Sequence, residues 1–264
     1  MKIKPIAAVR PNAGIEAMYQ RKLRALLDEM FASLIYWIGA AYRGQQDKMA
    51  ADASPAMALR QVMRKLARRW TKKFDEAIPS LASYFSTAMA DRTDAALRSA
   101  LKKAGVAVEW KMTREMNNVL QATIGEQVSL ITNLSQQALS NVEGLVMRAV
   151  ATGGDLQYLT QQLKERHGIE SRRAARIARD QTKKANSVMT RVRQAENGYT
   201  AVWKHSHASK EPRPEHLKWD GKEYDPAIGM WSDEEGRYVW PGELINCHCF
   251  SKTVPPWKQV GRAA

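Results

Sequence analysis

Apolar residues recur at the spacing of an α-helix through most of the first 197 residues, and this pattern constrains the fold more than any other feature. Between residues 15 and 38 the apolar positions share one face: Ile15, Met18, Tyr19, Leu23, Leu26, Leu27, Met30, Phe31, Leu34 and Ile38. Similar patterns predict helices that begin at Ser54-Pro55, run from about Ser80 to Lys103, and run from Lys111 to Val150. A short helix capped by Asp155 is predicted to end at Gly168, and a last helix to span Ser171 to Glu196. The pattern predicts a mainly α-helical body, arranged as a bundle or as extended helices.

The composition changes near the turn dipeptide Asn197-Gly198. Five of the 8 Trp, four of the 5 His, six of the 10 Pro and both Cys lie beyond it. Strands are predicted at Tyr199–His205 and Phe250–Val254, with a hairpin turn at Asp220-Gly221. We therefore expect an α+β protein with two domains: a basic helical body over 1–197, whose last helix is 170–196, and a small β-rich C-terminal module over 198–264.

The net charge of +14 lies almost wholly on the helical body. Residues 1–150 carry 22 basic and 13 acidic side chains and residues 151–203 carry 10 and 5, whereas residues 204–264 carry 9 of each. A solvated helix face explains such charge, and so does contact with DNA phosphates, which is independent of base sequence. The candidate DNA contacts are Arg60, Arg64, Lys65, Arg68, Arg69, Lys72, Lys73, Arg172, Arg173, Arg176, Lys183 and Lys184. The longest apolar run, Phe31 to Tyr42, is too short to span a bilayer, so no membrane insertion is expected.

Short motifs follow one another along the last third of the chain. They are the helical stretch 177–181 with Asn186 after it, Trp203, the step from Arg213 to His216, Asp220-Gly221, Pro241-Gly242, Cys247-x-Cys249 and Val254-Pro255. In this order and spacing they resemble the phage Mu F-like head morphogenesis family, over roughly Ala174 to Trp257. Within that resemblance Trp203, Arg213, His216, Asp220, Gly221, Pro241, Cys247 and Cys249 are structural determinants of the module.

The resemblance implies a minor head (capsid) protein that acts in head morphogenesis near the portal. Its roles would lie in capsid assembly, DNA packaging or DNA delivery by ejection. The implied partners are the portal or capsid proteins and packaged double-stranded DNA. The implied location is the virion, inside the head or near the portal, after assembly in the host cytoplasm. The family supplies no enzymatic reaction and no small-molecule substrate.

The two cysteines allow a metal site as an alternative to a module without a cofactor. His216, Cys247 and Cys249, with one of His205, His207 or His248, offer the four nitrogen and sulfur donors of a zinc site. The resemblance implies a larger set of metal ligands in many family members, with the pattern Cys-x-x-Cys followed by His-x-x-Cys-x-Cys. Here its first Cys position is Arg213, its second is His216 and its upstream His position is Leu244. The other interpretation is two buried free thiols beside a hydrogen-bonded His216.

Other functions remain as alternatives. The chain could be a DNA-binding accessory protein with no capsid role, or a helical scaffold that binds proteins alone. His216, Asn246 and His248 are also the residue types of a metal-dependent His-Asn-His nuclease, but no helix pattern follows Cys249. A cysteine nucleophile served by His248 is disfavoured, because adjacent residues in an extended segment point to opposite faces. The acidic residues 233–235 are interpreted as a solvated turn.

Overall fold

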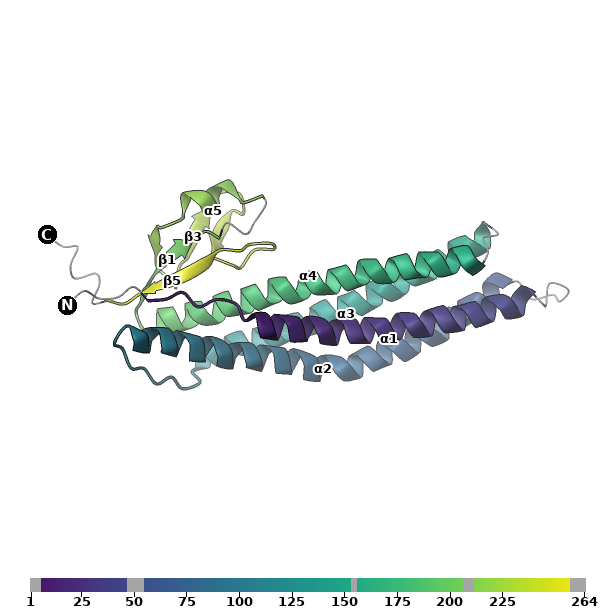
Figure 1. The fold of residues 1–264 in the computed structure, drawn as a ribbon, viewed down its shortest axis with the longest axis horizontal. Helices are drawn as coiled ribbons and strands as arrows, with labels where there is room; N and C mark the ends of the chain where they lie inside the picture. The colour runs from purple at the N-terminus through teal and green to yellow at the C-terminus, as the bar shows by residue number, and fades with distance from the viewer. Residues whose placement is uncertain (1–5, 47–54, 153–155, 207–210, 257–264) are drawn as a thin grey trace. The chain divides into compact units, whose positions relative to one another are not determined.

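The computed structural model describes residues 6–46, 55–152, 156–206 and 211–256 (Figure 1). Four long helices come first: α1 (Ala13–Gln46), α2 (Pro55–Lys103), α3 (Arg114–Ala151) and α4 (Leu156–Glu196). The module follows with β1 (Thr200–Lys204), α5 (Pro214–Lys218), β2 (Glu223–Tyr224), β3 (Met230–Ser232), β4 (Arg237–Val239) and β5 (Phe250–Val254). The predicted α+β class is confirmed. Four residues used in the predictions lie outside the described residues: Ser54, Asp155, His207 and Trp257.

Two predicted helix boundaries are wrong. α2 continues through Pro79, because the buried stripe runs on across it from Phe74 and Ile78 to Leu81 and Phe85. Burial of that stripe offsets the hydrogen bond that Pro79 cannot donate. α4 likewise continues through Gly168, because its buried positions repeat without a break at Leu159, Leu163, Glu170, Ala174 and Ala178. A glycine inside a helix costs about 1 kcal/mol relative to alanine, which a continuous buried face can outweigh.

The chain divides into two compact units, and α2, α3 and α4 each contribute to both. The helical unit consists of residues 17–83 and 125–178, and the mixed unit consists of the described parts of 1–16, 84–124 and 179–264. The secondary structure changes from helix to strand between Glu196 and Thr200. The expected domains, 1–197 and 198–264, remain a prediction.

The helical unit is built from four amphipathic segments that bury one face each. Its core holds Leu27, Met30 and Leu34 of α1 with Trp70 and Phe74 of α2. The buried faces of α3 and α4 add Ile131, Leu134, Val142, Leu159 and Leu163. Polar contacts join neighbouring helices, including the buried hydroxyl of Tyr19, which donates to Gln127 Oε1 at 2.7 Å. Among the described residues, none of the helices combines the length and apolar character that a bilayer crossing requires.

The mixed unit contains a three-stranded antiparallel sheet, ordered β2-β1-β5, and a separate two-stranded hairpin of β3 and β4. The predicted strands around 199–205 and 250–254 are therefore present as β1 and β5, paired from Thr200 with Val254 to Lys204 with Phe250. The predicted hairpin at Asp220-Gly221 is wrong, because the residues before it form the short helix α5 instead of a strand. Pro214 occupies the first turn of α5, where a proline favours helix. The turn at Gly221 (φ 83°) then brings β2 alongside β1.

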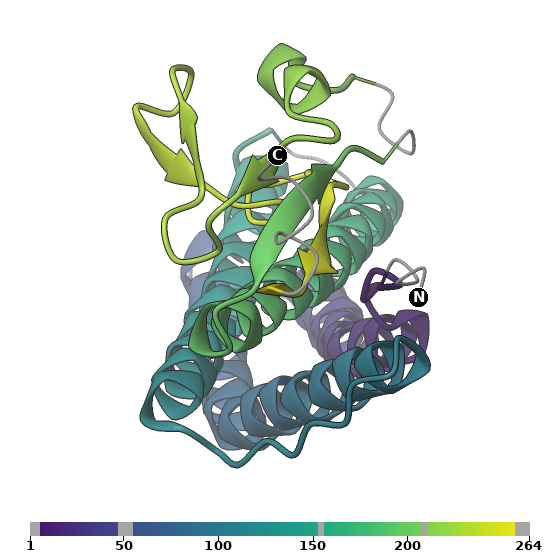
Figure 2. The same cartoon turned by 90° about the vertical axis from the view of Figure 1, so that its left-hand side faces the viewer.

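The C-terminal part of α4 lies beside the β-rich module, here residues 199–256 (Figure 2). Four of its residues, spaced so that they share one helix face, contact the module: Lys183, Ser187, Arg191 and Gln194. Their partners are His248, Pro241, the ring of Trp240, and the hydroxyls of Ser251 and Thr253. Within the mixed unit, this helix face positions the segment that leads into β5.

Candidate functional site

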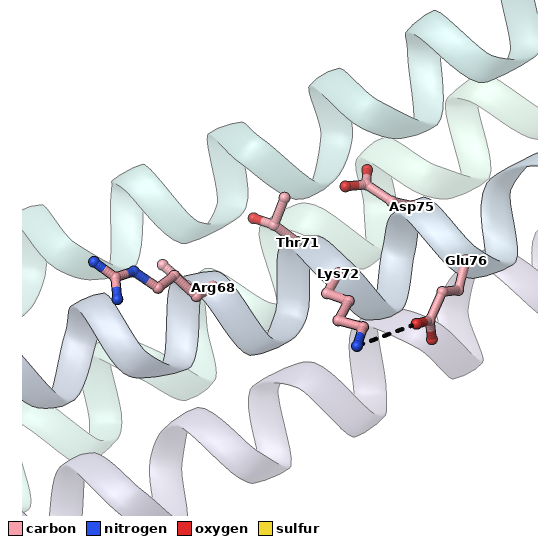
Figure 3. Close-up of a pocket in the computed structure, with 6 residues that line it drawn as sticks. Arg68, Thr71, Lys72, Asp75 and Glu76 are labelled. Carbon is pink, nitrogen blue, oxygen red and sulfur yellow. Dashed lines mark ion pairs between the residues drawn. The ribbon is translucent and has the colours of Figure 1, made fainter.

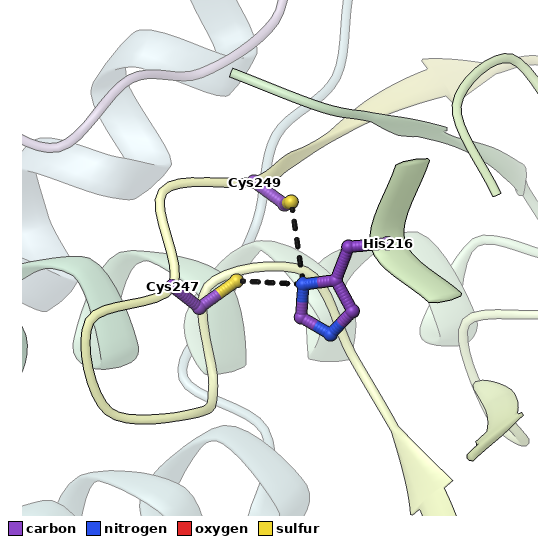
Figure 4. Close-up of side chains that lie close together, drawn as sticks. All are labelled: His216, Cys247 and Cys249. Atoms are coloured by element: carbon purple, nitrogen blue, oxygen red, sulfur yellow. Dashed lines mark hydrogen bonds between the residues drawn. The ribbon is translucent and has the colours of Figure 1, made fainter. Parts of the chain in front are cut away.

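One histidine and two cysteines converge in the interior of the module (Figure 4). Nδ1 of His216 lies 3.5 Å from Sγ of Cys247 and 3.6 Å from Sγ of Cys249. The three donor atoms lie within 4.8 Å of one another, and all three residues are buried. Two segments that are distant in the chain therefore supply one compact group of nitrogen and sulfur donors: α5, and the stretch between β4 and β5.

A second histidine contacts this cluster. Nδ1 of His205 lies 3.6 Å from Sγ of Cys249, and the residue is half-buried at the end of β1. Its backbone N–H donates to Oδ1 of Asp220 at 2.9 Å. Asp220 also pairs with Lys204, at 3.5 Å. Asp220 thus fixes the end of β1 at the place from which His205 reaches the sulfur.

His248 is directed elsewhere, although it lies between the two cysteines in the sequence. Its ring nitrogens lie 3.0 and 3.1 Å from Nζ of Lys183 on α4. Burial and the neighbouring Lys183 lower the pKa of His248, so the imidazole is neutral near pH 7 and can accept the lysine proton. Burial also lowers the pKa of Lys183. Three histidines were considered as a fourth ligand. His205 lies at the cluster, His248 contacts Lys183 of α4 instead, and His207 lies outside the described residues.

Aromatic rings hold His216 in place. The Trp203 ring meets it edge-on at 5.0 Å between centroids, and the Trp219 ring stacks on it at 5.3 Å. The far nitrogen Nε2 is buried and has no hydrogen-bond partner among the described residues. Ring packing therefore sets the orientation of the imidazole, which directs Nδ1 at both sulfurs.

The backbone around Cys247 is shaped to receive its side chain. Asn246 adopts a left-handed conformation (φ 59°), which asparagine tolerates, and the Cys247 N–H donates to the Leu244 carbonyl at 2.9 Å. The Gly242 N–H lies 3.4 Å from the Cys247 sulfur and donates to it. Gly242 itself has a φ of 82°, and a Cβ there would lie 3.1 Å from the Cys249 carbonyl oxygen. This explains the Pro241-Gly242 step physically, since only glycine fits the turn beside the cysteines.

The two thiols bias each other's protonation. Cys249 donates to Cys247, and this hydrogen bond, with a smaller contribution from His216, lowers the pKa of the Cys247 thiol well below its ordinary value despite burial. The same contact and burial raise the pKa of Cys249. The cluster thus combines two sulfur donors and one imidazole, a set that suits a cation with nitrogen and sulfur ligands.

A cavity of about 310 Å³ adjoins the cluster. Its lining includes all three residues of the nuclease alternative, His216, Asn246 and His248. Their polar atoms are used differently, however: His216 faces the sulfurs, His248 faces Lys183, and Asn246 is exposed. The described contacts give the nuclease interpretation no shared set of ligands for a catalytic metal.

The remaining predicted structural residues surround the cluster. Trp203 is fully buried and Gly221 donates its N–H to the Trp203 carbonyl at 2.8 Å. Arg213 precedes α5 and donates to the Ile245 carbonyl at 3.3 Å. The Pro241 carbonyl accepts from Ser187. The contact between α4 and the module was not predicted, although the spacing of 183, 187, 191 and 194 on one helix face contained a signal for it.

The basic residues of α2 form an exposed face in the helical unit: Arg60, Arg64, Lys65, Arg68, Arg69, Lys72 and Lys73. Figure 3 shows its C-terminal end, where Lys72 pairs with Glu76 at 3.9 Å beside a pocket of about 580 Å³ that Arg68 also lines. Lys73 pairs with Glu29 of α1. The described residues supply no ion-pair partner for the first five, which leaves their charges available to solvent.

The basic residues of α4 differ from one another. Arg172 and Arg176 are exposed, whereas Arg173 donates to Asn133 at 2.7 Å and pairs with the buried carboxylate of Glu170. Lys183 contacts His248. Lys184 is half-buried. The predicted DNA contacts on α4 therefore differ: Arg172 and Arg176 are exposed, whereas Arg173 and Lys183 contact other protein groups.

Comparison with known proteins gives two matches, each over part of the chain. Residues 140–251 match the family described as Phage Mu protein F like protein, so the match begins within α3, earlier than the resemblance over Ala174–Trp257. The chain is also 28% identical over 130 residues to an uncharacterized protein of Haemophilus influenzae. That alignment covers 49% of this chain and 28% of the relative's length. No solved structure matches.

Proposed function

Because residues 140–251 match the family described as Phage Mu protein F like protein, we propose that the chain is a minor head protein of a phage that acts in head morphogenesis near the portal. The family match is the observation that carries this proposal. The matched region includes α4, which packs against the module, and the segments that bring His216, Cys247 and Cys249 together. The proposed place of action is the virion, and the proposed partners are portal or capsid proteins.

The proposal assigns the module a structural role and no enzymatic reaction. The site residues contact one another and the buried rings around them, and the candidate nuclease groups do not share a set of ligands. We infer that such a module docks on a protein partner, while the exposed basic face of α2 makes other contacts.

The test is the composition of the heads made by the phage that encodes the chain. Purified heads are expected to contain the protein at low copy, and the purified portal protein of the same phage is expected to bind it. A deletion of the gene should reduce the yield of infectious particles, with rescue by the wild-type chain. Absence from heads together with no portal binding would overturn the proposal.

A second role, sequence-independent DNA contact during packaging or delivery, is favoured by the exposed cations of α2. Arg60, Arg64, Lys65, Arg68 and Arg69 have no ion-pair partner among the described residues, which is the state that phosphate contact requires. Replacement of Arg64, Lys65, Arg68 and Arg69 by Gln is expected to lower the slope of log affinity against log salt for double-stranded DNA by up to about 3.6. An unchanged slope would show that this face only keeps the protein soluble. Failure here, with the chain still found in heads, would remove the DNA role and leave the head role intact.

A further inference from the structure

We propose that the module binds one zinc ion through His205, His216, Cys247 and Cys249, as a closed structural site. The inference is independent of the head role. It concerns the fold of the module and would hold for any function of the chain.

The spacing of the donor atoms is the first argument. Zinc–sulfur bonds of about 2.3 Å and zinc–nitrogen bonds of about 2.0–2.1 Å place the nitrogen and sulfur ligands of a tetrahedral site about 3.5 Å apart. The three nitrogen–sulfur contacts of the cluster measure 3.5, 3.6 and 3.6 Å, between His216 and each cysteine and between His205 and Cys249. Three of the six donor–donor distances of the proposed tetrahedron therefore already have the length that zinc requires.

The source of the fourth ligand is the second argument. His216, Cys247 and Cys249 form the buried group of three, and a closed zinc site needs one more donor. His205 contacts the Cys249 sulfur, is half-buried, and has its backbone held by Asp220. His248 is ruled out by its contact with Lys183, whose positive charge also opposes a cation there.

The surroundings of the sulfurs are the third argument. The Gly242 N–H donates to the Cys247 sulfur at 3.4 Å, an interaction that stabilises a thiolate ligand. Stacking of Trp219 and edge contact of Trp203 fix the His216 ring with Nδ1 toward the sulfurs. Both features orient the ligands in advance, as a metal site requires.

The size of the module supplies a reason for the ion. Among the described residues, its buried hydrophobic cluster has seven members, two of which are the cysteines themselves: Ala201, Trp203, Trp219, Tyr224, Val239, Cys247 and Cys249. Met230, Trp240 and Leu244 are partly buried against it. A core this small is commonly reinforced by a metal or by disulfides. Zinc would tie α5 to the end of β1 and the segment before β5, which the pairing of Lys204 with Phe250 already holds side by side. Four protein ligands leave no position for water, so the ion would be structural and not catalytic.

The test uses the full chain, purified under reducing conditions and loaded with zinc alone. We expect one tightly bound zinc per chain, and X-ray absorption of the wild type should show two sulfur and two nitrogen ligands. Cobalt in place of zinc should give the visible bands of a tetrahedral site with thiolate ligands. Less than a stoichiometric amount of zinc in the loaded wild type, or an oxygen-rich ligand shell, would overturn the proposal without recourse to any variant.

Matched variants assign the fourth ligand. His205→Ala is expected to weaken zinc in competition with a chelator by more than the roughly 10- to 100-fold that loss of an outer-shell partner costs. His248→Ala, which removes another histidine from the same cavity, should leave the affinity within a few-fold of the wild type. His207→Ala should also have no effect. Unchanged affinity in His205→Ala, or a loss in His207→Ala, would overturn the assignment of His205.

Discussion

The two halves of α4 carry the same number of basic residues but use them differently. Residues 156–178 and 179–196 contain five each, yet the first half exposes Arg172 and Arg176 to solvent. In the second half, Lys183 contacts His248, Arg191 lies 4.0 Å from the Trp240 ring centroid, and Arg193 is buried against Asp94. A count of charged residues cannot distinguish an exposed cation from one that contacts the module. A cation already bound to protein groups is less available to DNA phosphates than one that faces water.

The largest expected effect on stability comes from the buried ion pair of Arg193 in the second half of α4. Asp94→Ala should lower the free energy of unfolding by about 3 kcal/mol, because it removes the carboxylate that accepts two hydrogen bonds from the guanidinium of Arg193, which is 2% exposed, and leaves Glu196 as its paired carboxylate. Chemical denaturation measures the loss. Asp75→Ala, an exposed acid on the same helix, serves as the control and should change stability by no more than about 0.5 kcal/mol. Equal effects of the two substitutions would contradict the structural role of Arg193.

A pair of double variants sharpens the contrast within α4. Arg172→Gln with Arg176→Gln should leave stability nearly unchanged and lower the salt slope of DNA binding by up to about 1.8. Lys183→Gln with Arg191→Gln should leave that slope unchanged and destabilise the fold by about 1–2 kcal/mol, since both side chains contact the module. DNA titrations at several salt concentrations, together with thermal melts, check both. A loss of stability in the first double variant, with a lower salt slope in the second, would contradict this contrast between the two halves of α4.

A smaller effect is expected at Glu215 on α5, which joins this helix to the β3–β4 hairpin. Its carboxylate accepts from the Ser232 hydroxyl and, at 2.8 Å, from the Asp233 N–H. These hydrogen bonds, led by that from Ser232, lower the pKa of Glu215 below its ordinary value of 4.5. Glu215→Gln should cost about 1 kcal/mol at pH 7.

The pH dependence of this effect has a definite sign. Because the folded state favours the carboxylate, its contribution is complete above pH 4.5 and is lost as the pH falls through the lower folded value. The difference between wild type and Glu215→Gln should therefore close on acidification. Melts from pH 7 to pH 3 measure it, and a difference that grows at low pH would argue against the bonded carboxylate.

The smallest effect tests whether α4 is continuous. Gly168→Ala should stabilise the protein by about 0.5–1 kcal/mol, because the residue lies inside the helix and a Cβ would meet only Arg172 Nη1, at 3.5 Å. If Gly168 ended a helix in a left-handed conformation, the same substitution would destabilise. The direction of the change in melting temperature decides between the two.

The sequence was sufficient to predict the helices and strands whose residue patterns lie within one short stretch of chain. Helical periodicity predicted the mainly helical body, though as more and shorter helices than the four observed, and the strands β1 and β5 were predicted with nearly their observed ends. The boundaries predicted at Gly168 and just before Ser80 were wrong, because buried faces that continue across them outweigh local propensity. The hairpin at Asp220-Gly221 failed because Pro214 starts a helix just before it.

The candidate site shows the same limit. Its three principal residues were identifiable by type, since a Cys-x-Cys with a nearby histidine suggests metal ligands. Which histidine completes the set was not accessible, because 44 residues separate His205 from Cys249 and only the pairing of β1 with β5 brings them together. The pairing of Arg193 with Asp94, 99 residues away, was equally inaccessible.

The mixed unit has a consequence for the order of folding, because it is assembled from three separate stretches of chain. Ile6 and Val9 pack with Leu97, Leu101 and Tyr199, and Asn186 donates to the Val9 carbonyl across 177 residues. During synthesis, the packing of Ile6 and Val9 remains incomplete until Tyr199 has been made. Such nonlocal closure is slow and exposes apolar surface to aggregation. The helical unit extends no further than residue 178, so it can form before the second half of α4 and the module have been made.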